Sequence, residues 1–189
     1  MVDSKILEVI KLRRSVRDFS DREIEQEKLD LILESARLAP SASNTQDWFF
    51  YVVKSKEPRE KIAASEPLMA NQFLRKAPVV IVGCEKLSGI VGAAAGAVLK
   101  TVGARHSGWG DVDVAIAMEH MVLTATDIGI GSCWVWIFDE RRVSRILDIP
   151  EDQRIIALLA LGYPIAPIES SMGIGKSSRL PLRDISKII

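Results

Sequence analysis

Two short segments of the chain combine residue types that could bind a phosphorylated small molecule. The first, the arginine segment (residues 13–17), reads Arg-Arg-Ser-Val-Arg and places three guanidinium groups and a hydroxyl within five residues. Arginine stays charged, and its planar fork of donors matches a phosphate or a carbonyl–imide edge. A simpler interpretation is that these arginines only offset the dipole at the end of a helix.

The second segment, the polar loop (residues 40–46), is small and polar and reads Pro-Ser-Ala-Ser-Asn-Thr-Gln. The side chains of Asn44 and Gln46 can each donate and accept hydrogen bonds, which suits a ligand edge that offers both kinds of partner. Loops between a helix and a strand often carry function, although many are only turns. Together the two segments favour a site for a phosphorylated, hydrogen-bonding cofactor.

Other kinds of chemistry find little support in the sequence. The chain has two histidines and two cysteines, and the isolated Cys84 and Cys133 cannot build an ordinary zinc site with them. The run from Gly173 to Ser177 lacks the first glycine of a phosphate-binding P-loop, because Ser170 stands at that position. We therefore predict no metal and no catalytic side chain, and we expect an organic cofactor to carry the reaction.

Composition predicts one soluble domain. The chain has 189 residues, 48% of them apolar and 26% charged, and a formal net charge of zero. A neutral chain has no overall field that would gather nucleic acid. The first five residues lack a secretion signal, and no apolar run reaches the ~18 residues of a membrane helix. We expect a cytoplasmic protein that binds neither nucleic acid nor membrane.

Apolar periodicity predicts helices that alternate with strands, which is typical of an α+β domain. The expected helices cover residues 5–12, 26–38, 57–64, 113–128 and 140–147. The expected strands cover residues 48–53, 78–84, 133–138 and 155–162, and the tail after Pro164 is expected to be extended. Helix 113–128 is apolar nearly all round, which places it in a core or an interface. Residues 86–110 favour no single element.

Several blocks, in register across nearly the whole chain, resemble the FMN-dependent nitroreductase family. They are Arg13 to Phe19, Ala36 to Trp48, Ala77 to Ile81, Ile128 to Trp134, Leu161 to Pro164 and Ser178 to Leu182. The resemblance implies a single FMN-binding domain over residues 1–189. It also implies a three-layer α/β/α sandwich around a mostly antiparallel sheet, in a homodimer with FMN at the subunit interface. Helix 113–128 would then lie at that interface.

The resemblance also assigns cofactor-binding residues. It implies that one group binds the FMN phosphate and the pyrimidine edge of the flavin: Arg13, Arg14, Ser15 and Arg17. Arg179 would add a second phosphate contact, with Lys176 as a further candidate. A second group would line the flavin from the other subunit: Pro40, Ser41, Ala42, Ser43, Asn44 and Gln46. A third group would run beside the ring: Trp134, Val135 and Trp136.

The activity that the resemblance implies is hydride transfer from NADH or NADPH to the flavin N5. A small-molecule acceptor, a nitroaromatic or a quinone, is then reduced at the same site. Dehalogenation, flavin fragmentation and flavin binding without catalysis stay open as alternatives. Asp47 departs from the family pattern, which commonly has proline there.

Overall fold

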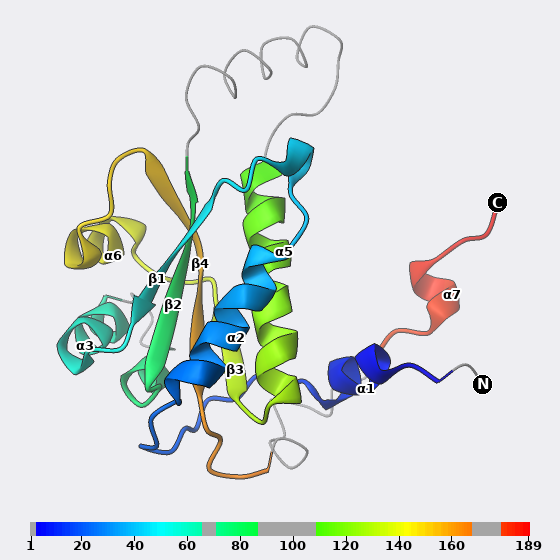
Figure 1. Cartoon of the computed structure of the whole chain (residues 1–189), viewed down its shortest axis with the longest axis horizontal. Coiled ribbons are helices and arrows are strands. Elements are labelled where there is room, and N and C mark those ends of the chain that lie inside the picture. The colour runs from blue at the N-terminus through cyan, green and yellow to red at the C-terminus, as the bar shows by residue number, and fades with distance from the viewer. Residues whose placement is uncertain (1–2, 66–70, 87–108, 168–178) are drawn as a thin grey trace, which may run out of the picture.

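The computed structural model describes residues 3–65, 71–86, 109–167 and 179–189 (Figure 1). Its helices are α1 (Lys5–Leu12), α2 (Gln26–Arg37), α3 (Lys56–Ala64), α5 (Trp109–Asp127), α6 (Glu140–Leu147) and α7 (Leu182–Ile185). Its strands are β1 (Trp48–Val53), β2 (Val79–Lys86), β3 (Gly131–Val135) and β4 (Gln153–Gly162). Short 3-10 turns lie at Ala42–Asn44 and Gln72–Arg75.

The four strands form one antiparallel sheet in the order β1-β2-β4-β3. The two central strands are apolar along most of their length, because both of their faces are covered. On β2, Val79 and Ile81 pack toward α2 and α5, whereas Val80 and Val82 pack toward the opposite face. This alternation follows from the two-residue period of a strand and divides the core into two halves.

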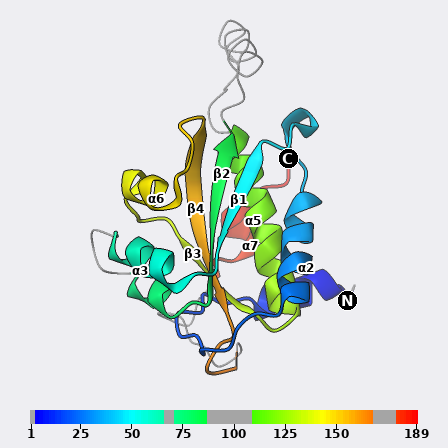
Figure 2. The same cartoon turned by 60° about the vertical axis from the view of Figure 1, so that its left-hand side comes forward.

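Helices cover both faces of the sheet, so the predicted three-layer sandwich is confirmed (Figures 1 and 2). Helices α2 and α5 cover one face, and α3 and α6 cover the other. Val114, Met118 and Met121 of α5 are fully buried against the sheet within their own chain. The helix ends at Asp127, and the turn that follows contains Gly129, whose positive φ of 77° suits a residue without a side chain.

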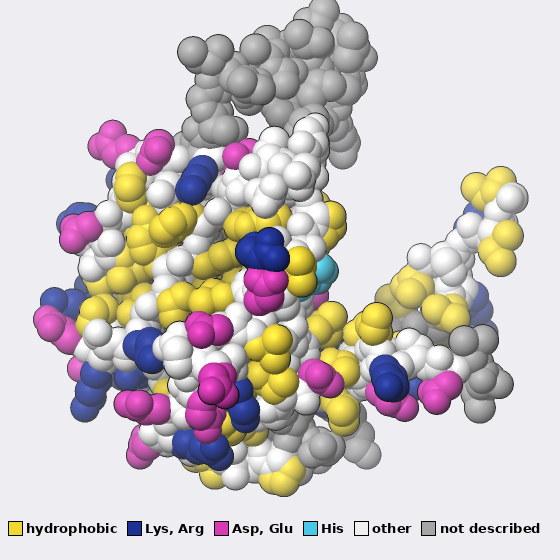
Figure 3. Space-filling model, in the orientation of Figure 1, with side chains coloured by type: hydrophobic (Ala, Val, Ile, Leu, Met, Phe, Trp, Pro, Cys, Tyr) yellow, Lys and Arg dark blue, Asp and Glu magenta, His cyan; other side chains and the backbone are white. Residues whose placement is uncertain are grey.

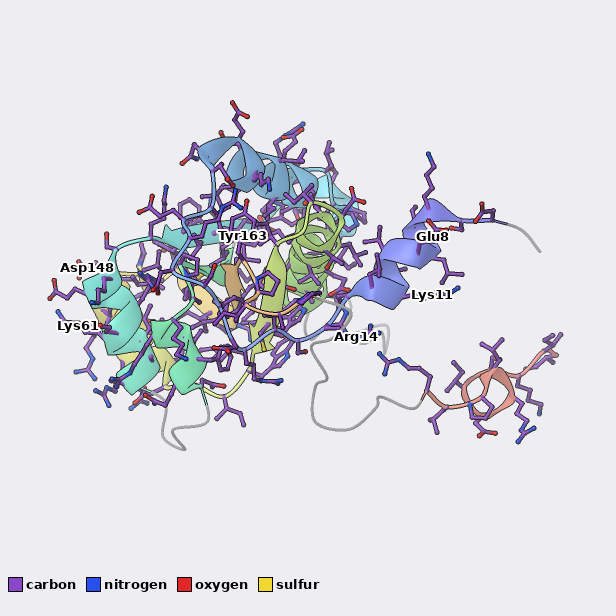
Figure 4. All side chains as sticks on the ribbon, turned by 90° about the horizontal axis from the view of Figure 1, so that it is seen from below. Glu8, Lys11, Arg14, Lys61, Asp148 and Tyr163 are labelled. Atoms are coloured by element: carbon purple, nitrogen blue, oxygen red, sulfur yellow. The ribbon has the colours of Figure 1, made fainter. Side chains whose placement is uncertain are left out.

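Two segments at the ends of the chain lie outside this packed body, and we call them the two arms (residues 3–12 and 179–189). Helix α1 contacts α5 at one end but has no buried residue (Figures 1 and 4). Figure 3 shows apolar side chains on both arms. The largest exposed ones are Ile6, Leu7, Ile10, Leu12, Leu180, Leu182, Ile185, Ile188 and Ile189.

The predicted elements agree with the structure except near their ends. Strand β3 was expected over residues 133–138 but spans Gly131–Val135, because Gly131 and Ser132 pair with β4 and the chain leaves the sheet after Val135. Helix α5 begins at Trp109 instead of residue 113, and the tail that was expected to be extended contains α7. Within the described residues, no helix combines the length and apolar character needed to cross a membrane.

Candidate cofactor site

The arginine segment lies beside the first residues of β3. Helix α1 ends at Leu12 and is capped by Arg13. Ser15 then forms an isolated parallel bridge with Ser132, in which the Val16 N–H donates to the Ser132 carbonyl at 2.8 Å. The approach depends on Gly131, because a Cβ added there would come within 2.9 Å of the Val16 Cβ. The bridge therefore places residues 13–17 along the edge strand that leads into residues 134–136. The family resemblance assigns both groups to the same flavin.

The four polar residues of the segment have different surroundings. Arg13, Ser15 and Arg17 act on the thiol of Cys133: burial raises its pKa, and the two arginines and a hydrogen bond with Ser15 oppose that rise. Arg14 turns back instead, and its Nη1 donates to the carbonyls of Lys11 at 2.5 Å and of Arg13 at 2.8 Å (Figure 4). The simpler interpretation, a cation at a helix end, thus describes Arg14 in this structure.

Trp134 of β3 and Trp136, just after the strand, form an aromatic wall on the α5 side of the sheet. The rings of Trp134 and Trp136 stack with their centroids 5.2 Å apart and an interplanar angle of 1°. The indole Nε1 of Trp134 donates to the Glu119 carboxylate of α5 at 3.3 Å, whereas Trp136 is 59% exposed. Val135, between them in sequence, is buried on the opposite face. The pair therefore offers an exposed aromatic face just beyond the end of β3. Arg17 lies on the other face of the sheet, where its guanidinium carbon is 5.8 Å from the centre of the Phe73 ring.

The polar loop joins α2 to β1 and has an unusual backbone. Ser43, Asn44 and Gln46 all have positive φ angles, of 51°, 56° and 52°. Non-glycine residues avoid this region, so such a cluster needs support from its surroundings and is typical of functional sites. Part of the support is local, because the Gln46 N–H donates to the Ser41 hydroxyl at 3.0 Å.

Asp113 of α5 supplies the rest of this support. Its side chain is buried, at 7% exposure, and its Oδ2 accepts from the Ala42 N–H at 3.0 Å. A buried carboxylate is costly unless it is hydrogen-bonded, so this contact links the stability of α5 to the conformation of the loop. Neither this role of Asp113 nor that of Glu119 was predicted from the sequence. The feature of the sequence that could have indicated both roles is an acidic residue within a helix that is otherwise apolar.

The arginine segment and the polar loop lie at opposite ends of α5 (Figure 1). The loop contacts Asp113 in the first turns of the helix, and the arginine segment pairs with Ser132, just beyond its last residue, Asp127. A helix rises 1.5 Å per residue, so the two segments are about 20 Å apart along its axis. One chain does not bring them together.

The remaining predicted contacts lie on or near the C-terminal arm. Arg179 is exposed, and the structure describes no contact between it and the arginine segment. Lys176 lies outside the described residues. Among the described residues, no three histidine, cysteine or acidic side chains gather as a set that could hold a metal ion.

Comparison with known proteins identifies the family. The model of the Nitroreductase family matches residues 10–67 and 63–163, and the chain belongs to this family. A protein of Archaeoglobus fulgidus is 36% identical over 164 residues, which cover 84% of each chain; its provisional name is NADH dehydrogenase/NAD(P)H nitroreductase.

Two solved structures share the fold. The crystal structure of a nitroreductase family protein from Clostridium novyi NT is 33% identical, with a TM-score of 0.72 over 85% of this chain and 86% of that one. An FMN-dependent nitroreductase from Clostridium difficile R20291 is 28% identical, with a TM-score of 0.70 over 85% and 88%. The expected fold class and family are thereby confirmed.

Proposed function

We propose that this protein is an FMN-dependent oxidoreductase that uses NADH or NADPH to reduce a small-molecule acceptor such as a nitroaromatic, a quinone or a related compound. The observation that carries the proposal is the bridge between Ser15 and Ser132, which joins the arginine segment to the strand that leads into the stacked tryptophans. Membership of the Nitroreductase family and the names of its relatives support the same activity.

The chemistry of these residues fits FMN. Its phosphate carries nearly two negative charges at neutral pH, and the guanidinium groups of Arg13 and Arg17 with the Ser15 hydroxyl supply donors and positive charge for it and for the pyrimidine edge. The indole rings of Trp134 and Trp136 offer an apolar surface of a size that suits a planar ring. The polar loop offers amides and backbone groups for the remaining ring edge.

The site requires two copies of the chain. Because the arginine segment and the polar loop lie about 20 Å apart along α5, side chains of both cannot reach one flavin ring from the same chain. We propose that the loop of one subunit completes the site formed by the arginine segment of the other. This is the homodimer that the family resemblance implies.

The two arms support the homodimer as well. Ile6 is 69% exposed and Leu182 is 78% exposed, and both belong to segments with no buried residues. Large apolar side chains gathered on exposed segments mark surfaces that bind another chain. We propose that the arms pack against the second subunit.

When bound, FMN would supply the hydride and electron transfer that links the reductant to the acceptor. The arginines stabilise negative charge at the pyrimidine edge, and the tryptophan wall limits the access of water to the ring. The thiol of Cys133 stays protonated at neutral pH because burial raises its pKa. Reductant and acceptor exchange at the same face, so the acceptor is selected by the shape of the pocket.

Anaerobic reduction of the purified protein tests the proposal. Protein reconstituted with FMN is expected to be yellow and to bleach when NADH or NADPH is added without oxygen, and colour should return when a quinone is added. Bound flavin that no reductant bleaches would point to a flavin-binding protein without catalysis. Failure to take up FMN at all would overturn the proposal. Halide release or flavin breakdown would identify the alternative reactions.

A further inference from the structure

A basic cavity of about 250 Å³ lies at the end of the sheet where β1 stops and β2 begins. Part of its wall is apolar, from Ile24, Pro78 and Val79. Its charged lining consists of Lys54, Lys56, Arg59, Arg75, Lys76, Asp21 and Glu23. Five cations and two acids give a local excess of positive charge in a chain whose formal net charge is zero. Figure 3 shows basic side chains along the lower left of the molecule, over α3, with acidic ones between them.

Arg59 is a fixed cation in this lining. Its Nε donates to the Lys54 carbonyl at 3.2 Å, and its Nη1 donates to the carbonyls of Arg75 and Ala77. Burial lowers the pKa of Arg59, but the ordinary pKa of arginine lies so far above neutrality that the group stays charged. Its Nη2 donates to no group in the described part of the chain. A guanidinium held in place in this way loses little entropy when it binds an anion.

The other cations of the cavity differ in whether a neighbouring side chain already pairs with them. Lys76 forms an ion pair with Asp18 at 3.2 Å, and Lys56 lies 3.9 Å from Glu60. Lys54 donates to the Gln26 side chain at 3.4 Å. Arg75 is exposed and forms no ion pair with any described residue. Arg59 and Arg75 are therefore the two guanidinium groups with donors to offer to a ligand.

We propose that this cavity binds the phosphate group of a small molecule. Five cations from two stretches of the chain, residues 54–59 and 75–76, face one partly open volume, which suits a compact dianion better than a carboxylate or an extended polyanion. The cations exclude a metal ion, and Asp21 and Glu23 disfavour a long polyanion such as a nucleic acid. The group could belong to the 2′-phosphate of NADPH or to a free phosphorylated compound. The site itself does not depend on the proposed oxidoreductase activity.

Calorimetric titration of the FMN-saturated protein with inorganic phosphate tests the site, against chloride at equal ionic strength. Arg75→Gln and Lys56→Gln remove exposed cations without touching the core, and each is expected to weaken phosphate binding about tenfold. The matched control is Lys61→Gln: Lys61 is on the same helix as Lys56 but outside this cavity, paired with Glu57 at 2.7 Å (Figure 4). It should leave the affinity unchanged.

Coenzyme kinetics identify the source of the phosphate. If it belongs to NADPH, Arg75→Gln raises the KM for NADPH and not for NADH, and inorganic phosphate competes with NADPH. If it belongs to a free compound, neither KM changes while phosphate affinity falls. The proposal is overturned if the unmodified protein binds no phosphate, if Lys61→Gln is as damaging as Arg75→Gln, or if Arg75→Gln weakens FMN binding, because the cavity would then belong to the FMN site.

Discussion

Arg13 caps the C-terminus of α1 and, with Arg17, lies near enough to the Cys133 thiol to oppose the rise of its pKa. If it contacts the FMN phosphate, Arg13→Ala should weaken FMN binding by about 1.5–3 kcal/mol, the scale of a lost charge-assisted hydrogen bond. Arg179→Ala should have a similar effect. Quenching of flavin fluorescence on binding measures the affinity. Arg141→Ala, an exposed arginine on α6 across the sheet, is the control. If all three variants bind FMN as tightly as the unmodified protein, neither Arg13 nor Arg179 contacts the phosphate.

Asp113 should affect FMN binding without contacting it. Asp113→Ala leaves the Ala42 N–H without its acceptor and frees a loop with three left-handed residues, at a cost of about 1–3 kcal/mol. We expect FMN affinity to fall about tenfold, because the loop would no longer be held in place beforehand and FMN binding would have to order it. Asp113→Asn keeps an acceptor oxygen and should retain most of the affinity. Asp127→Ala, at the exposed end of the same helix, is the control. If Asp113→Ala and Asp113→Asn behave alike, the hydrogen bond is not the cause.

Glu25 should make stability depend on acid pH. The Tyr163 hydroxyl donates to the Glu25 carboxylate at 2.5 Å. This hydrogen bond, together with hydrogen bonds from the Glu25 backbone and from Arg22, lowers the pKa of Glu25 from 4.5 to about 2. A group whose pKa is lowered on folding adds stability above its unfolded pKa and loses it as the pH falls toward the folded pKa. The contribution of Glu25 is therefore complete above about pH 4.5 and fades between 4.5 and 2.

Urea unfolding of FMN-free protein at several pH values measures this dependence. Glu25→Gln should be less stable than the unmodified protein at pH 6, and the difference should shrink as the pH falls to 3. The effect should be modest and sensitive to salt, because Glu25 and Arg22 are exposed. A difference that stays constant over this range would show that Glu25 does not titrate as described.

At the scale of elements, α5 links the core to both parts of the candidate site. Met121 is fully buried between α2 and the sheet, so Met121→Asp should destabilise the fold by about 3–5 kcal/mol or more, the cost of an uncompensated buried charge. Leu123 on the same helix is only half-buried, and Leu123→Asp should leave the chain folded. Circular dichroism during denaturation compares the two. A stable, folded Met121→Asp protein would contradict the position of α5 in the core.

Sequence periodicity predicted the elements well because apolar faces are local properties of a segment. Helix 5–12 and strand 48–53 match the structure at both ends. The bounds of β3 were misplaced because Ser132 is held in the strand by Ser15 and Leu161, which are distant in sequence. The role of Asp113 was missed for the same reason, since it binds a residue 71 positions away. Periodicity alone left α5 between core and interface, because a helix that is apolar all round suits both, and only the family resemblance assigned it to the interface.

At the scale of the whole molecule, the separation of the arginine segment and the polar loop has a genetic consequence. A chain with Arg13→Ala and a chain with Asn44→Ala should each form only defective sites. When the two are unfolded and refolded together, a mixed dimer would carry one site with both substitutions and one site with neither. Random pairing makes about one site in four intact, since half of the dimers are mixed and each has one such site.

Stoichiometric FMN binding and NAD(P)H oxidation of the mixture measure this recovery. Activity near a quarter of that of the unmodified protein, from two chains that are inactive alone, is the expected outcome. No recovery in a mixture shown to contain mixed dimers would mean that each chain builds its site alone. Two inactive alleles of this protein should therefore complement one another whenever their lesions lie at opposite ends of α5.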